Sequence, residues 1–218
     1  MRLTTVLFDF DGTLANTLPL TIHGMRDVFE RYDQQTLSAA DVIDRFGPTE
    51  DGMIANNFVH QQYVDEAIAR YYEIYTQDHI REVAVNPLIN KLLKELRARR
   101  FKTGVITGKS RRSYEISEQI LGFESFFDCV ITGNDVTEPK PNPEGILKAM
   151  DALHADPQTT IYIGDSNNDI LAGKAAGTYT AAVQWLEMAQ SADYPANPDF
   201  LWHDIHDCID LIQSQSNE

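Results

Sequence analysis

The sequence has 218 residues, of which 43% are hydrophobic and 23% charged, and its formal net charge is -15 at pH 7. This length allows one domain with a sizeable core, or one domain with a small insert. The acidic charge argues against a nucleic-acid partner, because phosphate backbones require basic surfaces, but a metal ion and a few local cations still allow a small anionic substrate.

Short apolar runs predict the buried strands of a parallel sheet, which is covered on both faces. These runs are Thr5–Phe10, Lys102–Thr107, Cys129–Thr132 and Thr160–Gly164, with a fifth candidate at Tyr179–Gln184. Helical patterns alternate with them at Pro87–Arg100, Ser110–Leu121, Asn142–Leu153, Asn168–Ala176 and His206–Gln213. The alternation predicts an α/β fold with a doubly wound, Rossmann-like parallel sheet.

The region that follows the first strand interrupts this alternation. Its segments read as helices at Leu18–Tyr32, Ser38–Phe46, Asp51–Val59 and Tyr63–Gln77. Ser38 and Asp41 resemble a capping pair at the start of the second of these segments. We therefore predict a core domain formed by residues 1–15 and 85–218, and an all-helical cap domain formed by residues 16–84.

The first predicted strand carries Asp9 and Asp11 near its C-terminal end. Alternation along a strand places the two carboxylates on one side, roughly 6–7 Å apart. Open α/β sheets bind ligands at this end of their strands. Two carboxylates this close repel, so a cation is expected between them, and Mg²⁺ suits such a site. A solvated Asp-Gly turn is the alternative interpretation.

Polar residues follow three other predicted strands. Thr107 and Gly108 combine a hydroxyl with backbone N–H groups, which is typical of an anion cradle or a simple helix cap. Lys140 stands between two prolines that stiffen its loop, so its ammonium can be aimed at a phosphate. Asp165 and Asp169 bracket the turn after the fourth strand. Each feature alone has an ordinary loop explanation, but their shared position at strand ends predicts one site.

These motifs resemble those of the haloacid dehalogenase superfamily, in its phosphatase branch with a helical cap. The resemblance rests on "DFDGTL", on "VIT" ending at Thr107, on Lys140 and on "GDSNND", and it spans Leu7 to Asp169 in order. It is specific for the superfamily and says little about the substrate.

The resemblance implies a role for each matching residue. Asp9 would attack phosphorus to form an aspartyl-phosphate, and Asp11 would protonate the leaving oxygen and then activate water. Thr107 and the amide of Gly108 would hold phosphate oxygens, while Lys140 would neutralise nucleophile and phosphate. The turn that delivers Asp11 would be shaped by Gly12 and Thr13. The implied Mg²⁺ ligands are Asp9, the backbone carbonyl of Asp11, Asp165 and Asp169.

The resemblance also narrows the reaction. The presence of Asp11 favours phosphate esters over carbon–halogen or carbon–phosphorus bonds. Mutase relatives carry a histidine about where Thr21 stands, and an arginine in the cap loop, which reads "FGPTEDG" here. We expect a phosphoglycolate phosphatase-like hydrolase of a small phosphorylated metabolite. A pyrophosphatase or a phosphomutase of the same superfamily is the alternative, and a non-catalytic phospho-accepting or binding protein is the alternative from a different class.

Two residues are candidates for substrate selection, Arg45 just before the cap loop and Glu50 within it. Arg45 could contact a substrate carboxylate or a second phosphate, and a surface arginine is its ordinary explanation. Cys129 and Cys208 show no CxxC or metal-type spacing, which favours a cytoplasmic location. We expect no signal peptide and no membrane segment, and a monomer or a homodimer.

Overall fold

Six apolar segments of the described chain, residues 2–215 of this computed structural model, form adjacent parallel strands. The strand order is β3-β2-β1-β4-β5-β6, and each neighbouring pair is parallel. The bounds are β1 (Thr5–Phe8), β2 (Lys102–Ile106), β3 (Cys129–Ile131), β4 (Thr160–Gly164), β5 (Tyr179–Val183) and β6 (Phe200–Trp202). The doubly wound α/β prediction is confirmed, because the order reverses at β1 and its connections cross over through helices.

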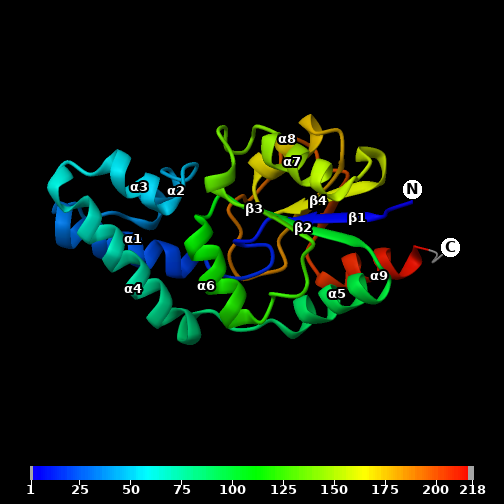
Figure 1. Cartoon of the computed structure of the whole chain (residues 1–218), viewed down its shortest axis with the longest axis horizontal. Helices are drawn as coiled ribbons and strands as arrows, with labels where there is room; N and C mark the ends of the chain where they lie inside the picture. The colour runs from blue at the N-terminus through cyan, green and yellow to red at the C-terminus, as the bar shows by residue number, and fades with distance from the viewer. Residues whose placement is uncertain (1, 216–218) are drawn as a thin grey trace.

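Helices cover both faces of this sheet (Figure 1). One face packs against α5 (Pro87–Ala98), α6 (Arg111–Leu121) and α9 (Ile205–Ser214), and the other against α7 (Glu144–Leu153) and α8 (Asn167–Ala175). Side chains alternate along β1 accordingly, so that Val6 and Phe8 join one apolar cluster while Leu7 joins the other. All three are fully buried, which makes β1 the centre of the core.

The sequence of α5 shows why such a helix forms and where it begins. Asn86 caps its N-terminus by accepting a hydrogen bond from the Leu88 backbone N–H at 2.9 Å, and Pro87 occupies the first turn, where no N–H is needed. Its buried residues recur at helical spacing and are Ile89, Leu92, Leu93 and Leu96. Burying each such side chain contributes on the order of 2 kcal/mol, so tertiary packing stabilises the helix more than its propensity does.

The insertion between β1 and α5 is helical, as its sequence predicts. It comprises α1 (Leu18–Asp33), α2 (Ala39–Ile43), α3 (Glu50–Asn57) and α4 (Val64–Glu82), with the short 3-10 helix η1 (Gln61–Tyr63). Ser38 and Asp41 form the expected capping box at α2. We call α1–α4 the cap helices; they lie to one side of the sheet (Figure 1). α1 and α4 pack closely, and a side chain at Gly24 would come within 2.9 Å of the Tyr71 ring.

The cap helices meet the sheet domain along α4 and α6, through hydrogen bonds between uncharged groups. The Tyr72 hydroxyl lies 2.8 Å from Ser110 Oγ, and the Tyr75 hydroxyl lies 2.8 Å from Ser117 Oγ. Nε2 of His79 lies 2.9 Å from the same Ser117 oxygen. Burial lowers the pKa of His79 to about 4, so its imidazole is neutral here. We call these contacts the α4–α6 seam.

Two features of the fold differ from the sequence prediction. The strand expected over Thr5–Phe10 ends at Phe8, so Asp9 and Asp11 lie in the turn beyond it rather than on one face of a strand. The Asp9 N–H still bonds the Ile163 carbonyl at 2.8 Å, but the N–H groups of residues 13–15 then bond the Phe10 carbonyl and form a tight turn. The strand β6 had no counterpart in the prediction.

The remaining short elements are η2 (Gly133–Asp135) and η3 (Pro157–Thr159). Across residues 2–215, the helices all fall short of the length and apolar character that a membrane span requires.

Candidate active site

The turn after β1 depends on two residues, Gly12 and Trp185. Gly12 has φ +75°, and a Cβ there would lie 2.1 Å from Oδ2 of Asp165, so both backbone conformation and space require glycine. The indole N–H of Trp185 donates to the Thr13 carbonyl at 2.8 Å. The Trp185 ring stacks on that of Trp202, with centroids 6.3 Å apart and planes 11° apart. The predicted residues Gly12 and Thr13 therefore fix the path of the turn.

Three buried carboxylates meet at this edge of the sheet, as the sequence predicts. Asp9, Asp165 and Asp169 each offer one oxygen, and these oxygens lie within 4.8 Å of one another. Asp9 is 2% exposed and the other two are fully buried. Asp169 belongs to the capping box of α8, where its Oδ2 accepts from the Ser166 N–H at 3.0 Å. Asp165 Oδ2 accepts from the Gln190 N–H at 2.6 Å.

Lys140 brings an ammonium to this cluster. Its Nζ lies 2.9 Å from Asp9 Oδ1 and 2.6 Å from Asp169 Oδ1, and the Tyr162 hydroxyl is 3.2 Å away. Burial disfavours the ammonium, but the carboxylates of Asp169 and Asp9 outweigh it and raise the pKa of Lys140 well above its usual range. Lys140 is therefore a fixed positive charge beside Asp9, as its stiff loop predicts.

The carboxylates outnumber this ammonium three to one. Burial, followed by the neighbouring Asp169 and Asp11, raises the pKa of Asp9 to about 7 despite the opposing effect of Lys140. Burial and the charges of Asp9 and Asp169 raise the pKa of Asp165 well above its usual range. An excess of converging, buried carboxylate oxygens is a donor set that fits a hard divalent cation such as Mg²⁺.

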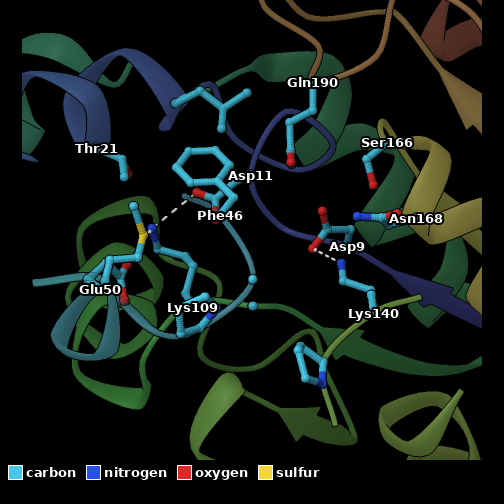
Figure 2. Close-up of a pocket in the computed structure, with 16 residues that line it drawn as sticks. Asp9, Asp11, Thr21, Phe46, Glu50, Lys109, Lys140, Ser166, Asn168 and Gln190 are labelled. Carbon is cyan, nitrogen blue, oxygen red and sulfur yellow. Dashed lines mark hydrogen bonds and ion pairs between the residues drawn. The ribbon is translucent and has the colours of Figure 1, made fainter. Parts of the chain in front are cut away.

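Asp11 lies on the opposite side of the pocket from this cluster, beside a second lysine (Figure 2). Its Oδ1 accepts from the ammonium of Lys109 at 3.1 Å and from the Thr17 hydroxyl. The Lys109 ammonium is also 3.3 Å from Glu50 Oε1, and Glu50 Oε2 accepts from the Ser110 N–H at 2.7 Å. Lys109 is 3% exposed and Glu50 4%, so this charge network is buried between the cap helices and the sheet domain.

The pocket that holds these groups opens between the turn, the cap loop and the loop after β5. Its acidic and basic lining consists of Asp9, Asp11, Glu50, Lys109 and Lys140. The cap contributes an apolar wall that includes Leu18, Phe46 and Met53, together with Thr21. Ser166, Asn168 and Gln190 form part of the opposite rim (Figure 2), and Gly108 also lines the pocket.

The structure places the other predicted site residues as follows. Thr107 is buried, and its Oγ1 accepts from the Lys109 N–H at 3.2 Å, next to the pocket-lining Gly108. Arg45 is not among the residues that line the pocket. Its guanidinium lies 5.8 Å from the centre of the Phe29 ring and donates to the Asp41 carbonyl. The structure therefore brings Glu50 into the pocket but turns Arg45 back along α2.

Lys109 and Gln190 are among the residues that the structure brings to the site and that sequence reasoning missed. Lys109 directly follows the Thr107–Gly108 pair, and that position was the available signal. Gln190 lies in an irregular loop with no recognisable pattern, yet both its N–H and its side-chain amide donate to Asp165.

Comparison with known proteins gives sequence matches over almost the whole chain. The family model described as haloacid dehalogenase-like hydrolase matches residues 6–183. Pyrophosphatase PpaX of Bacillus cereus (strain G9842) is 32% identical over 216 residues, which are 99% of this chain and 99% of that protein.

Two solved structures show the same fold at lower identity. A predicted phosphoglycolate phosphatase from Haemophilus somnus 129PT has a TM-score of 0.82 and 19% identity, with 97% of this chain and 98% of that chain covered. CbbY from Rhodobacter sphaeroides in complex with phosphate has a TM-score of 0.80 and 22% identity, with 94% and 95% covered.

Proposed function

The chain belongs to the family of haloacid dehalogenase-like hydrolases and acts on phosphate ester bonds, and from this premise we propose that it hydrolyses a small phosphomonoester with Mg²⁺ through an aspartyl-phosphate on Asp9. The observation that supports the nucleophile is the setting of Asp9, which is buried, paired with Lys140 at 2.9 Å and next to Asp165 and Asp169. A carboxylate held this way can approach an anionic phosphoryl group once the surrounding charge is balanced.

In the proposed first step, a carboxylate oxygen of Asp9 forms a bond to phosphorus while the bond to the leaving oxygen breaks. Asp11 gives a proton to that leaving oxygen, so the product departs as an alcohol. Lys140 offsets the negative charge that Asp9 and the phosphoryl oxygens bring together. Thr107 and the backbone N–H of Gly108 are proposed to hold the phosphoryl oxygens.

In the second step, Asp11 takes a proton from a water molecule, and the water oxygen attacks phosphorus. The bond between phosphorus and Asp9 breaks, which releases inorganic phosphate and restores the carboxylate. Asp9, Asp165 and Asp169 would hold Mg²⁺, with the Asp11 carbonyl as the further proposed ligand. When bound there, Mg²⁺ supplies positive charge that lowers the repulsion between nucleophile and phosphate.

Residues 16–84 are proposed to act as a cap domain that opens and closes over this pocket. The pocket lies where the cap helices face the turn, and the α4–α6 seam contains hydrogen bonds that water can replace. Closure would exclude bulk water during attack by Asp9. Within the cap, Glu50 lines the pocket and Arg45 lies just before the same loop, so both stay candidates for substrate selection.

Pyrophosphate hydrolysis is the second candidate function. The observation that favours it is the 32% identity with pyrophosphatase PpaX over nearly the full chain. The same chemistry applies, since phosphate rather than an alcohol would then leave. The mutase alternative has less support, because Thr21, which lines the pocket, carries no group that titrates near neutral pH.

The test is a panel of pyrophosphate, 2-phosphoglycolate, sugar phosphates and 4-nitrophenyl phosphate, assayed with purified protein and Mg²⁺. We expect turnover that EDTA abolishes and that added Mg²⁺ restores. A kcat/KM for pyrophosphate at least about tenfold above the phosphomonoesters would favour the second candidate. Full activity without any divalent ion would remove the metal site, and a lack of turnover on the whole panel would favour the non-catalytic alternative.

A further inference from the structure

We propose that Lys109 is a positioning residue that holds the carboxylate of Asp11 in the orientation needed for proton transfer. This inference rests on the proposed function, because it assigns a task to Lys109 within that reaction. It starts from the contacts of Asp11, whose Oδ1 is bound by the Lys109 ammonium at 3.1 Å and by the Thr17 hydroxyl (Figure 2).

The contacts of Lys109 argue against a direct role in binding phosphate. An ammonium has three N–H donors, and here it faces Asp11 Oδ1 at 3.1 Å, Glu50 Oε1 at 3.3 Å and the Tyr75 ring at 4.7 Å. Two carboxylates therefore neutralise it and would repel an incoming anion. Lys140 also has two carboxylate partners, Asp9 and Asp169, but they belong to the cluster that would hold Mg²⁺, and the charge of that ion would offset theirs.

The same contacts distinguish the two oxygens of Asp11. Lys109 and Thr17 both donate to Oδ1, and no residue in the described part of the chain donates to Oδ2. A proton cannot easily occupy an oxygen that already accepts two hydrogen bonds from donors. Oδ2 is therefore the oxygen that carries the proton, gives it to the leaving oxygen and later takes one from water.

Glu50 links this arrangement to the cap helices. It is the first residue of α3, and its Oε2 accepts from the Ser110 N–H at the start of α6. Its other oxygen holds Lys109, whose ammonium holds Asp11. When the cap helices are seated on the sheet domain, the ammonium is fixed from both sides. Lys109 thus makes the orientation of Asp11 depend on the seating of the cap.

The experiment measures kcat/KM with Mg²⁺ for 2,4-dinitrophenyl, 4-nitrophenyl and phenyl phosphate, whose leaving groups are progressively more basic. The ratio kcat/KM includes only the reaction steps up to formation of the aspartyl-phosphate. It therefore reports protonation of the leaving oxygen and not the later hydrolysis. The variants are Lys109→Met, Lys109→Arg and Asp11→Asn. Lys148→Met is the matched control, because it makes the same substitution at an exposed lysine of α7 whose ammonium contacts Glu144 and the Asp135 carbonyl instead of Asp11.

Loss of a general acid should cost most where the leaving group is poor. We expect Asp11→Asn to lose about 10²–10⁴-fold on phenyl phosphate, and Lys109→Met roughly 10–100-fold there but less than about threefold on the dinitrophenyl ester. Lys109→Arg should lie between wild type and Lys109→Met, because the planar guanidinium keeps the charge but not the three contacts of the ammonium. Lys148→Met should keep the wild-type dependence on the leaving group.

A uniform loss on all three esters in Lys109→Met, or a wild-type pattern, would overturn the positioning role. Should Lys109→Met not fold, a wild-type pattern in Lys109→Arg would overturn it instead. The proposed function fails separately, if wild type hydrolyses none of the esters or if Asp11→Asn shows no greater loss on phenyl phosphate.

Discussion

Replacing Asp165 by Asn should stabilise the protein without metal while destroying its response to Mg²⁺. Asp165 is fully buried, and the carboxylate oxygens of Asp9 and Asp169 lie within 4.8 Å of its own. At that distance two charges repel by about 3–4 kcal/mol when the effective dielectric constant is about 20. Asn has the same shape and no charge, and its carbonyl oxygen can still accept from the Gln190 N–H.

The net gain is smaller than this repulsion, because burial and the neighbouring carboxylates already raise the pKa of Asp165 and favour its neutral form. Loss of the attraction to Lys140 reduces it further. We therefore expect Asp165→Asn to raise the free energy of unfolding in EDTA by about 1–3 kcal/mol. For a chain of this size each kcal/mol corresponds to roughly 2–4 °C in Tm.

Mg²⁺ should reverse the order of stability. Wild type should gain about 4.1 kcal/mol at a Mg²⁺ concentration a thousandfold above its Kd, which exceeds the lead of the variant in EDTA, whereas Asp165→Asn should gain little. Thermal unfolding of both proteins in EDTA and across a Mg²⁺ titration measures both effects. Asp151→Asn is the matched control, since Asp151 is exposed on α7 and far from charge crowding. If the Asp165→Asn protein is less stable than wild type in EDTA, or responds to Mg²⁺ as wild type does, then repulsion at Asp165 does not limit stability and Asp165 is not a metal ligand.

Three further outcomes follow from the same cluster. Asp9→Asn should fold with wild-type circular dichroism yet lose measurable turnover, and normal turnover would rule out the covalent mechanism. Lys140→Met should lower kcat by at least about 10²–10³-fold and destabilise the fold by about 3–5 kcal/mol in denaturant titrations, because buried carboxylates lose their cation. In EDTA, the free energy of unfolding of wild type relative to that of Asp165→Asn should fall as pH rises from about 4 to about 7. The reason is that Asp165, and Asp9 with a pKa raised from 3.8 to about 7, keep protons in the folded chain that the unfolded chain has released. His79, whose pKa burial lowers to about 4, contributes the opposite slope to both proteins. Saturating Mg²⁺ should flatten that fall, and a pH profile unaltered by Mg²⁺ would count against ionised ligands.

The sequence predicted the fold and the site correctly where hydrophobic periodicity identified an element or where polar residues followed a strand. Buried strands such as β1 and β4 are continuous apolar runs, and the polar residues that follow them reach one sheet edge because parallel strands end together. That geometry brought Asp9, Lys140, Asp165 and Asp169 together as predicted. The helical insertion was recognisable for a similar reason, because no apolar run of strand type interrupts it.

The rest depended on information that no short pattern contains. The chain turns after β1, so Asp9 and Asp11 do not lie on one side of a strand, and the prediction from strand alternation was wrong. The role of Lys109 depends on its ion pair with Glu50, which lies 59 positions away in the cap. The strand β6 has three residues, too few to show a period, and it forms because β5 offers a free edge beside it.

The tryptophan pair has an optical consequence. The chain has two tryptophans, and both belong to the stacked pair whose Trp185 indole binds the Thr13 carbonyl. Excitation of tryptophan therefore selects a single place in the molecule, directly behind the turn that carries Asp9 and Asp11. Indole emission depends on the polarity and hydrogen bonding around the ring. Any ligand that shifts this turn should change the emission of the unlabelled protein, so stopped-flow fluorescence can follow occupation of the pocket in real time, without a dye or an engineered probe.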